Sequence, residues 1–244
     1  MNKTAFCRLI FFMREIFIFL INHKLFNKIK RYDSIVKNKL KQGKWKKYFG
    51  GVVMSYYKKI LGENVYLSPA TFEDVEAYTK WMNDFNITDY TGVSSNVYSL
   101  EKEREWLEDK LKYSSNKDML FDIVAIDGDR LLGNVSLIGI NYIDRKANLG
   151  ILIGENDDRS KGYGTEAIKL LLDFAFNYLN LNNVGLTLIE CNNRAKRCYE
   201  KAGFKEFGRR RKVIFVNGKY YDQIYMDILA EEFKGEYIKN KNIK

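Results

Sequence analysis

The residues with the clearest chemical potential form a short glycine-rich stretch, Arg159-Ser-Lys-Gly-Tyr-Gly-Thr-Glu166. An apolar run of strand length, residues 147–153, precedes it, and a longer apolar segment that extends to Leu181 follows it. A strand, a glycine-rich turn and a helix in this order form a phosphate site, because glycines let successive backbone N–H groups point into one concavity. The dipole of the helix and the cations Arg159 and Lys161 would add positive charge. The stretch therefore predicts a phosphorylated ligand.

The spacing of this motif narrows the kind of phosphate. A dinucleotide fingerprint needs a third glycine and a later acidic residue, and a P-loop needs Gly-Lys-Ser/Thr, so both are disfavoured. The pattern Arg-x-x-Gly-x-Gly between a strand and a helix resembles the pyrophosphate loop with which GNAT-type N-acyltransferases bind acyl-CoA. The alternative is a tight turn that is capped by Thr165 and binds nothing.

Other reactive side chains are scarce. The only histidine is His23, so the body of the chain lacks an imidazole for a Ser/His/Asp or Cys/His arrangement. Cys7, Cys191 and Cys198 lack the paired spacing of a zinc site, and we expect no metal. Unpaired cysteines are typical of a reduced, cytoplasmic protein. Acid–base chemistry would fall to carboxylate, tyrosine, thiol, water or backbone groups.

The elements that must position these residues follow from the hydrophobic pattern. We expect a strand, two helices, three antiparallel strands, the central helix, a strand, a helix and two final strands. The loop between the first two helices is expected over residues 84–98, and Asn217-Gly218 predicts the last hairpin. A parallel crossover inside an otherwise antiparallel sheet, with about four helices, makes the fold class α/β, or α+β mixed.

A second motif follows the strand expected at 184–189. Residues 192–204 resemble the second GNAT signature, Asn-x-x-Ala-x-x-x-Tyr-x-x-x-Gly-Phe, and every fixed position is present. Short matches at Leu67-Ser-Pro, Trp81-Met-Asn-Asp84 and Asn217-Gly-Lys-Tyr-Tyr-Asp222 are similar to the branch that includes ribosomal-protein and spermidine N-acetyltransferases. The resemblance covers about residues 64–233. It implies a V-shaped split between two middle strands of the sheet and acetyl-CoA as acyl donor.

The resemblance also implies a role for each matching residue. An amine would attack the thioester carbonyl, and a backbone N–H in the split would polarise the oxygen of that carbonyl. Tyr199 would protonate the leaving thiolate. The remaining residues would bind the donor: the strand residues Ile151 and Ile153, the side chain of Asn192, and the loop residues Arg159, Lys161, Gly162, Tyr163, Gly164 and Thr165.

Several of these roles have structural alternatives. Tyr199 can be a core aromatic of a short helix, and Asn192 can be a helix cap. Cys198 is expected to face the core or sheet rather than act as a nucleophile. The run 209–212, Arg-Arg-Arg-Lys, is typical of an exposed strand, although it would also suit an acidic substrate group. The general base is left open among Glu155, Asp122, Asp84 and Glu103.

Charge is distributed unevenly along the 244 residues. Residues 1–53 hold 13 Lys and Arg against two acids, whereas the remainder has 28 basic and 29 acidic residues. Nucleic-acid binding by the folded domain is therefore not expected. We expect a basic and apolar extension over 1–53, an N-acetyltransferase domain over 54–235, and a basic tail over 236–244.

Three interpretations of residues 1–53 remain open. The apolar run from Leu9 to Ile21 with the basic stretch after it suits a peripheral membrane anchor. An interaction arm is the second interpretation. The third is that translation starts at Met54, because Gly50-Gly51 can be encoded by a purine-rich, ribosome-binding-like stretch. We favour the third.

The sequence therefore predicts an acetyl-CoA-dependent N-acetyltransferase that acts by direct transfer to a primary amine. Polyamines, aminoglycosides, amino sugars and protein N-termini are the acceptors that the resemblance implies, and a homodimer is an open alternative. The rival hypothesis is a non-catalytic acyl-CoA-binding or sensory module. A membrane-tethered regulator working through residues 1–53 is a second rival.

Overall fold

The computed structural model describes residues 56–112, 117–235 and 237–238. The chain divides into two units, Met1–Met54 and Ser55–Lys244, and all described residues belong to the second. The predictions for residues 1–53, and for all but two residues of the tail at 236–244, lie outside the described residues. Among the described helices, none combines the length and apolar character that crossing a bilayer requires.

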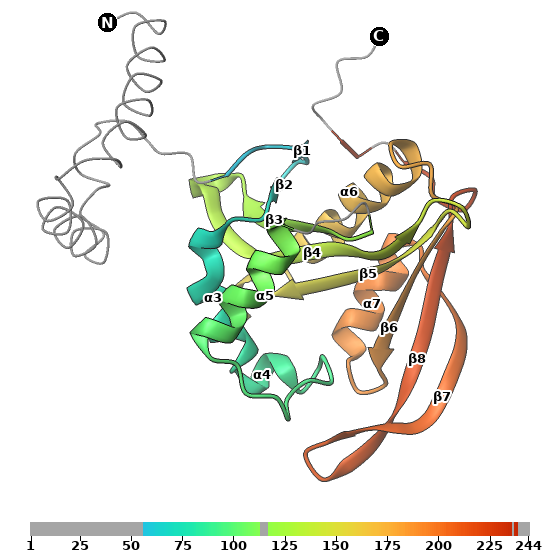
Figure 1. Cartoon of the computed structure of the whole chain (residues 1–244). Helices are drawn as coiled ribbons and strands as arrows, with labels where there is room; N and C mark the ends of the chain where they lie inside the picture. The colour runs from blue at the N-terminus through green and yellow to red at the C-terminus, as the bar shows by residue number, and fades with distance from the viewer. Residues whose placement is uncertain (1–55, 113–116, 236, 239–244) are drawn as a thin grey trace, which may run out of the picture. The chain divides into compact units, whose positions relative to one another are not determined.

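The described residues form one eight-stranded sheet with helices on both faces (Figure 1). The strand order is β1-β2-β3-β4-β5-β6-β8-β7. The first half of the domain contains β1 (Ile60–Leu61), β2 (Val65–Pro69), the 3-10 turn η3 (Phe72–Asp74), α3 (Val75–Met82), α4 (Phe85–Thr88), α5 (Leu100–Lys112), β3 (Met119–Ala125), η4 (Asp127–Asp129), β4 (Arg130–Asn141) and β5 (Lys146–Ile153).

The second half contains the elements around the two motifs: η5 (Asn156–Asp158), α6 (Tyr163–Asn177), β6 (Asn183–Ile189), α7 (Asn193–Ala202), β7 (Lys205–Val216) and β8 (Lys219–Leu229). This order confirms the mixed α/β fold class. The described part has five α-helices, because a short one, α4, lies within the region 84–98 that was expected to be a loop. The Asp84 side chain caps this helix by accepting from the Asn86 N–H at 2.8 Å. Four residues are too few to leave a helical period in the sequence.

Alternation along the strands builds two separate cores. On β3, Phe121 and Ile123 face α6 and α7, whereas Leu120 faces α3 and α5. α6 is largely buried, and most of its buried side chains are apolar. The Asp173 carboxylate on α6 is fully buried and accepts the Ile238 N–H at 3.0 Å.

The sheet opens between β5 and β6, the only parallel pair among the described strands. These strands pair only at Lys146–Asn183, Ala147–Val184 and Asn148–Gly185. β5 nevertheless stays paired with β4 as far as Ile153, and β6 stays paired with β8 as far as Ile189. The two strands therefore separate after these three residue pairs, which confirms the predicted V-shaped split.

Candidate active site

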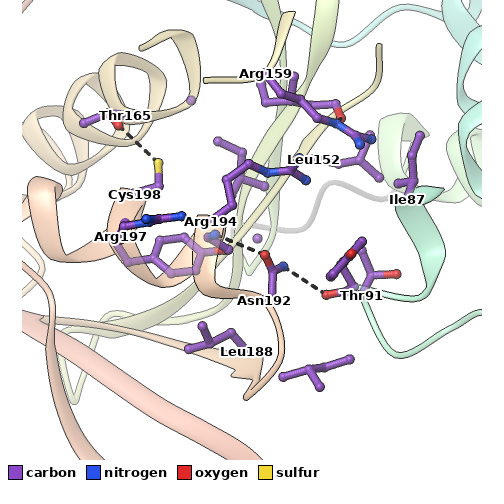
Figure 2. Close-up of a pocket in the computed structure, with 18 of the residues that line it drawn as sticks. Ile87, Thr91, Leu152, Arg159, Thr165, Leu188, Asn192, Arg194, Arg197 and Cys198 are labelled. Atoms are coloured by element: carbon purple, nitrogen blue, oxygen red, sulfur yellow. Dashed lines mark hydrogen bonds between the residues drawn. The ribbon is translucent and has the colours of Figure 1, made fainter. Parts of the chain in front are cut away.

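A cleft of about 560 Å³ occupies the opening between β5 and β6 (Figure 2). Its size suits a small-molecule site. Eight of the ten predicted site residues line it: Ile151, Ile153, Arg159, Gly162, Gly164, Thr165, Asn192 and Tyr199. Lys161 and Tyr163 do not. The Lys161 side chain is half exposed, 4.0 Å from Asp158, and Tyr163 packs against the main core.

The loop before α6 leaves free donors at the end of the cleft. Gly162 adopts φ 92° and is the N-cap residue directly before α6, with no side chain capping the helix. The first backbone hydrogen bond of the helix runs from the Glu166 N–H to the Gly162 carbonyl, at 3.0 Å. The N–H groups of the three residues before Glu166 therefore have no acceptor within the helix. Gly164 and Thr165 line the cleft. Unpaired N–H groups and a helix dipole at one point form an anion site.

Thr165 does not cap this turn. Its hydroxyl lies 3.2 Å from the Cys198 sulfur, on the facing helix α7. The Thr165–Cys198 contact therefore joins the two helices that flank the cleft, and Figure 2 shows it as a dashed line. The expected alternative of a turn closed by Thr165 is not what the structure contains.

Arg159 was expected to be a cation at the rim of the phosphate site, but its guanidinium binds backbone carbonyls. Its guanidinium donates to the carbonyls of Ile153 at 3.3 Å, Gly154 at 3.2 Å and Asn86 at 3.4 Å. These bonds tie the end of β5 to α4. Burial, and then the nearby charge of Arg194, lower the pKa of Arg159. The residue lines the cleft and contributes charge, but its donors hold the backbone.

Asn192 caps α7, as the alternative interpretation expected. Its Oδ1 accepts the Ala195 N–H at 3.0 Å, and its Nδ2 donates to the Tyr90 carbonyl at 3.2 Å. The amide therefore fixes the start of α7 to the loop after α4, across the opening. One of its two amide hydrogens has no partner among these bonds.

Tyr199 lies on α7 and lines the cleft while being only 8% exposed. Its ring packs edge-on against Phe204, with 6.0 Å between centroids. Burial, with a smaller contribution from Cys198, raises the pKa of the Tyr199 hydroxyl well above its ordinary value. The hydroxyl therefore stays protonated across the physiological range and is a proton donor rather than a base.

Cys198 packs against the main core, as expected, and it also lines the cleft. Burial raises the pKa of its thiol, and burial likewise raises the pKa of Cys191. The thiolate is the nucleophilic form of cysteine, so both thiols are in their unreactive form near neutral pH. The geometry does not favour a covalent acyl-cysteine step.

The cations on α7 were not among the predicted site residues. Arg194, Arg197 and Lys201 all line the cleft. They are spaced by three and four residues, which places them on one helical face. That spacing was a usable signal, but these positions are unspecified in the second motif. The Arg194 guanidinium lies 6.0 Å from the centre of the Tyr90 ring.

None of the four proposed general bases lines the cleft. Glu155 binds Lys80 at 2.6 Å, and hydrogen bonds from Lys80 and Trp81 lower its pKa. Asp84 is occupied as the cap of α4. Burial raises the pKa of Glu103, and it raises the pKa of Asp122 to about 8. The described residues therefore single out no carboxylate base, and the general base stays unassigned.

The chain is similar to known proteins both in sequence and in fold. Residues 64–205 match the family model described as an acetyltransferase (GNAT) domain. YdaF of Bacillus subtilis, whose name assigns it provisionally as a ribosomal N-acetyltransferase, is 34% identical over 106 residues, 43% of this chain and 57% of YdaF. Spermidine N(1)-acetyltransferase of Escherichia coli K12 is 34% identical over 115 residues, 47% of this chain and 61% of the relative. The chain thus spans less than two thirds of either relative's length.

The fold comparison covers more of the chain. A crystal structure of spermidine N-acetyltransferase from Vibrio cholerae, in complex with CoA and spermine, superposes with a TM-score of 0.63 and 30% identity. The match covers 69% of this chain and 97% of that one. An acetyltransferase of Bacillus anthracis has a TM-score of 0.61 at 22% identity, which supports the fold alone. Relatives of both kinds named in the sequence analysis are therefore found.

Proposed function

The chain belongs to the GNAT acetyltransferase family, and we propose that it transfers the acetyl group of acetyl-CoA directly to a primary amine. The observation that carries this proposal is the opening between β5 and β6, which leads to an uncapped helix N-terminus at Gly162. The thioester of the donor supplies an activated acyl group. The residues of this chain have to bind the donor, orient it toward the amine and protonate the departing thiolate.

The loop at 159–165 is proposed to hold the diphosphate of the donor. The N–H groups of Tyr163, Gly164 and Thr165 have no helical acceptors, and the exposed Lys161 adds a cation beside them. Arg197 and Lys201 on α7 extend the positive surface. The residues present therefore fit a polyanionic donor.

The strand residues Ile151 and Ile153 are proposed to bind the arm that carries the thioester. β5 has no β6 partner from Leu149 onward, so one edge of its backbone is available to another chain-like ligand. The remaining amide hydrogen of Asn192 is the donor that we assign to the same arm. Holding donor and amine together supplies much of the rate enhancement.

Tyr199 is proposed to donate its hydroxyl proton to the departing thiolate. The raised pKa of this tyrosine keeps the proton in place before transfer. Direct transfer is favoured over a covalent acyl-cysteine because the Cys198 thiol is protonated near neutral pH.

The finer identity of the acceptor stays a proposal. Polyamines are candidates because relatives are named spermidine N-acetyltransferases. Aminoglycosides, amino sugars and protein N-termini are the other candidates. A homodimer and a cytoplasmic location stay predictions.

The test is a panel of primary amines incubated with acetyl-CoA, with release of free thiol as the readout. Calorimetry of acetyl-CoA binding runs in parallel on the same preparation. We expect saturable binding and acetylation of at least one amine. Binding without turnover of any amine would support the rival acyl-CoA-binding module, and absence of binding would exclude both functions.

A further inference from the structure

The cleft is strongly positive. Five charged side chains line it. One is a carboxylate, Asp158, and four are cations: Arg159, Arg194, Arg197 and Lys201. Asp158 is already neutralised, because both of its oxygens accept from the Arg130 guanidinium. An excess of positive charge in a confined cleft attracts anions and repels cations. Only part of this charge lies where the donor is expected.

The cations divide between two ends of the cleft. Arg197 and Lys201 lie one and two turns beyond Arg194 along α7, and Figure 2 shows Arg197 beside Cys198, close to the α6 end. Arg159 and Arg194 instead extend their guanidinium groups toward the side where Ile87 and Leu152 lie (Figure 2). Arg159 is bound there to the Asn86 carbonyl of α4.

Arg194 has no carboxylate partner among the described residues. Its guanidinium lies 6.0 Å from the centre of the Tyr90 ring. Its positive charge also acts on the like charge of Arg159. Arg159 donates to the carbonyls of Ile153 and Gly154, and these bonds hold its guanidinium in place. Burial, and then the charge of Arg194, lower the pKa of Arg159. The carboxylates of Asp84 and Glu155 act on this pKa in the opposite direction. An anion bound beside Arg194 would relieve the repulsion between the two cations.

Apart from the four cations and Asp158, the residues that line the cleft are neutral. Its floor comes from Ile189 and Gln223, which pair directly across β6 and β8, and from Ile214 of β7. A Cβ on Gly92 would lie 3.6 Å from Ile189 and 3.9 Å from Ile214, so the loop after α4 closes over this floor.

Two carboxylates beside the end of β6, Glu190 and Asp222, are already engaged in ion pairs. Glu190 binds Arg209 at 3.1 Å, and Asp222 binds Arg209 at 3.5 Å and accepts the Lys212 N–H at 2.9 Å. Arg209, the first residue of the basic run, is thus neutralised and is not free to bind a substrate. Among the residues that line the cleft, a second ammonium group of the acceptor would find cations and one carboxylate, Asp158, that is already paired with Arg130.

We propose that the acceptor carries an anionic group, a carboxylate or a phosphate, near its primary amine, and that Arg194 binds this anion. The inference rests on the proposed acetyl transfer and specifies its acceptor. A bound anion at Arg194 has two sources in principle, the acceptor or the diphosphate of the donor. The two are distinguished by whether loss of Arg194 affects the acceptor or acetyl-CoA.

The experiment compares three amines of equal chain length: β-alanine, 3-amino-1-propanol and 1,3-diaminopropane. Wild type is expected to use β-alanine with the highest kcat/KM. Arg194→Gln is expected to lower kcat/KM for β-alanine by about tenfold to hundredfold, the range for a lost charge-assisted hydrogen bond. Its values for 3-amino-1-propanol and the KM for acetyl-CoA should change less than about threefold. Lys219→Gln, at an exposed position outside the cleft lining, removes the same charge and is expected to match wild type.

Three results would overturn the inference while leaving acetyl transfer intact. They are a wild-type preference for 1,3-diaminopropane, an unchanged amine preference in Arg194→Gln, and a rise in the KM for acetyl-CoA that matches the loss with β-alanine. The last result would assign Arg194 to the donor. Failure of wild type to acetylate any amine while it still binds acetyl-CoA would instead refute the proposed function, and the inference with it.

Discussion

Tyr199 combines burial with access to the cleft, and this combination suits a proton donor. Its ring packs in the main core against Phe204, while its residue lines the opening between β5 and β6. The same burial that makes it resemble a core aromatic also raises its pKa and keeps its proton in place. The core and catalytic interpretations of this residue are therefore compatible.

Tyr199→Phe should lower kcat by about a hundredfold, the lower part of the range for loss of a general acid. The dissociation constant for acetyl-CoA should stay within about twofold of wild type, because the ring still fills its place. Steady-state kinetics and calorimetry measure the two quantities. Tyr142→Phe, at an exposed position in the turn after β4, is the matched control. An unaffected kcat in Tyr199→Phe would remove the assigned role.

At the scale of elements, the start of α6 forms the proposed diphosphate site. Gly162 needs its left-handed φ of 92°, so any replacement there mixes backbone strain with loss of binding. Gly164 has no such requirement. A Cβ at that position would meet Ile153 and Cys198 at 3.6 and 3.7 Å, which are ordinary contacts. Position 164 therefore separates binding from folding.

Gly164→Val should weaken acetyl-CoA binding at least about tenfold, because its methyl groups would occupy the space in front of the helix N–H groups. The melting temperature should change by only a few degrees, since no backbone strain is introduced. Calorimetry and thermal unfolding measure the two effects, and Gly164→Ala should show a smaller loss of affinity. Unchanged affinity in the valine variant would count against the loop assignment.

A second element contact fixes α3 against the end of β5. A Cβ on Gly154 would lie 1.9 Å from the Trp81 indole, so only glycine lets the helix approach this closely. Trp81 is 3% exposed and its Nε1 donates to Glu155 at 3.3 Å. The wall of the cleft that includes α4 depends on this approach, because α4 follows α3 directly.

Gly154→Ala should destabilise the domain by about 1–3 kcal/mol, the usual cost of overpacking a core. Gly208→Ala is the control, because a Cβ on this strand glycine would meet nothing within 4 Å. Its free energy of unfolding should stay within about 0.5 kcal/mol of wild type, as for most surface substitutions. Chemical denaturation of the two variants makes the comparison, and equal stabilities would contradict the close packing of Trp81.

At the scale of the whole molecule, a buried acidic cluster links the start of the domain to the sheet. Tyr56 donates to Asp74 at 2.9 Å, Tyr78 donates to Asp122, and the Thr71 N–H donates to Asp122 at 3.2 Å. The second Asp74 oxygen is buried without a hydrogen-bond partner. Burial, and next to it the Asp74 charge, raise the pKa of Asp122 to about 8 from an ordinary value of 3.8.

The folded state therefore holds a proton on Asp122 between about pH 4 and pH 8 that the unfolded chain releases. Stability should fall as pH rises through this window, because the folded state binds more protons there. Burial also raises the pKa values of Asp74 and Glu103, which act in the same direction. Asp122→Asn should show a smaller loss of melting temperature between pH 5 and pH 8.5 than wild type. Parallel curves for the two proteins would show that Asp122 does not carry this proton.

The sequence by itself determined the fold class, the order of most elements and the two motifs, because these depend on local patterns of apolar residues, glycines and caps. Eight of the ten site residues predicted from the sequence line one cleft. The tertiary structure alone decided which donors are already occupied. Arg159 holds backbone carbonyls, Asn192 caps α7, and Arg194 faces Tyr90 without a carboxylate partner among the described residues. A side chain's partners come from segments far away in the chain, so local spacing cannot reveal whether its charge or its hydrogen bonds remain available for a ligand.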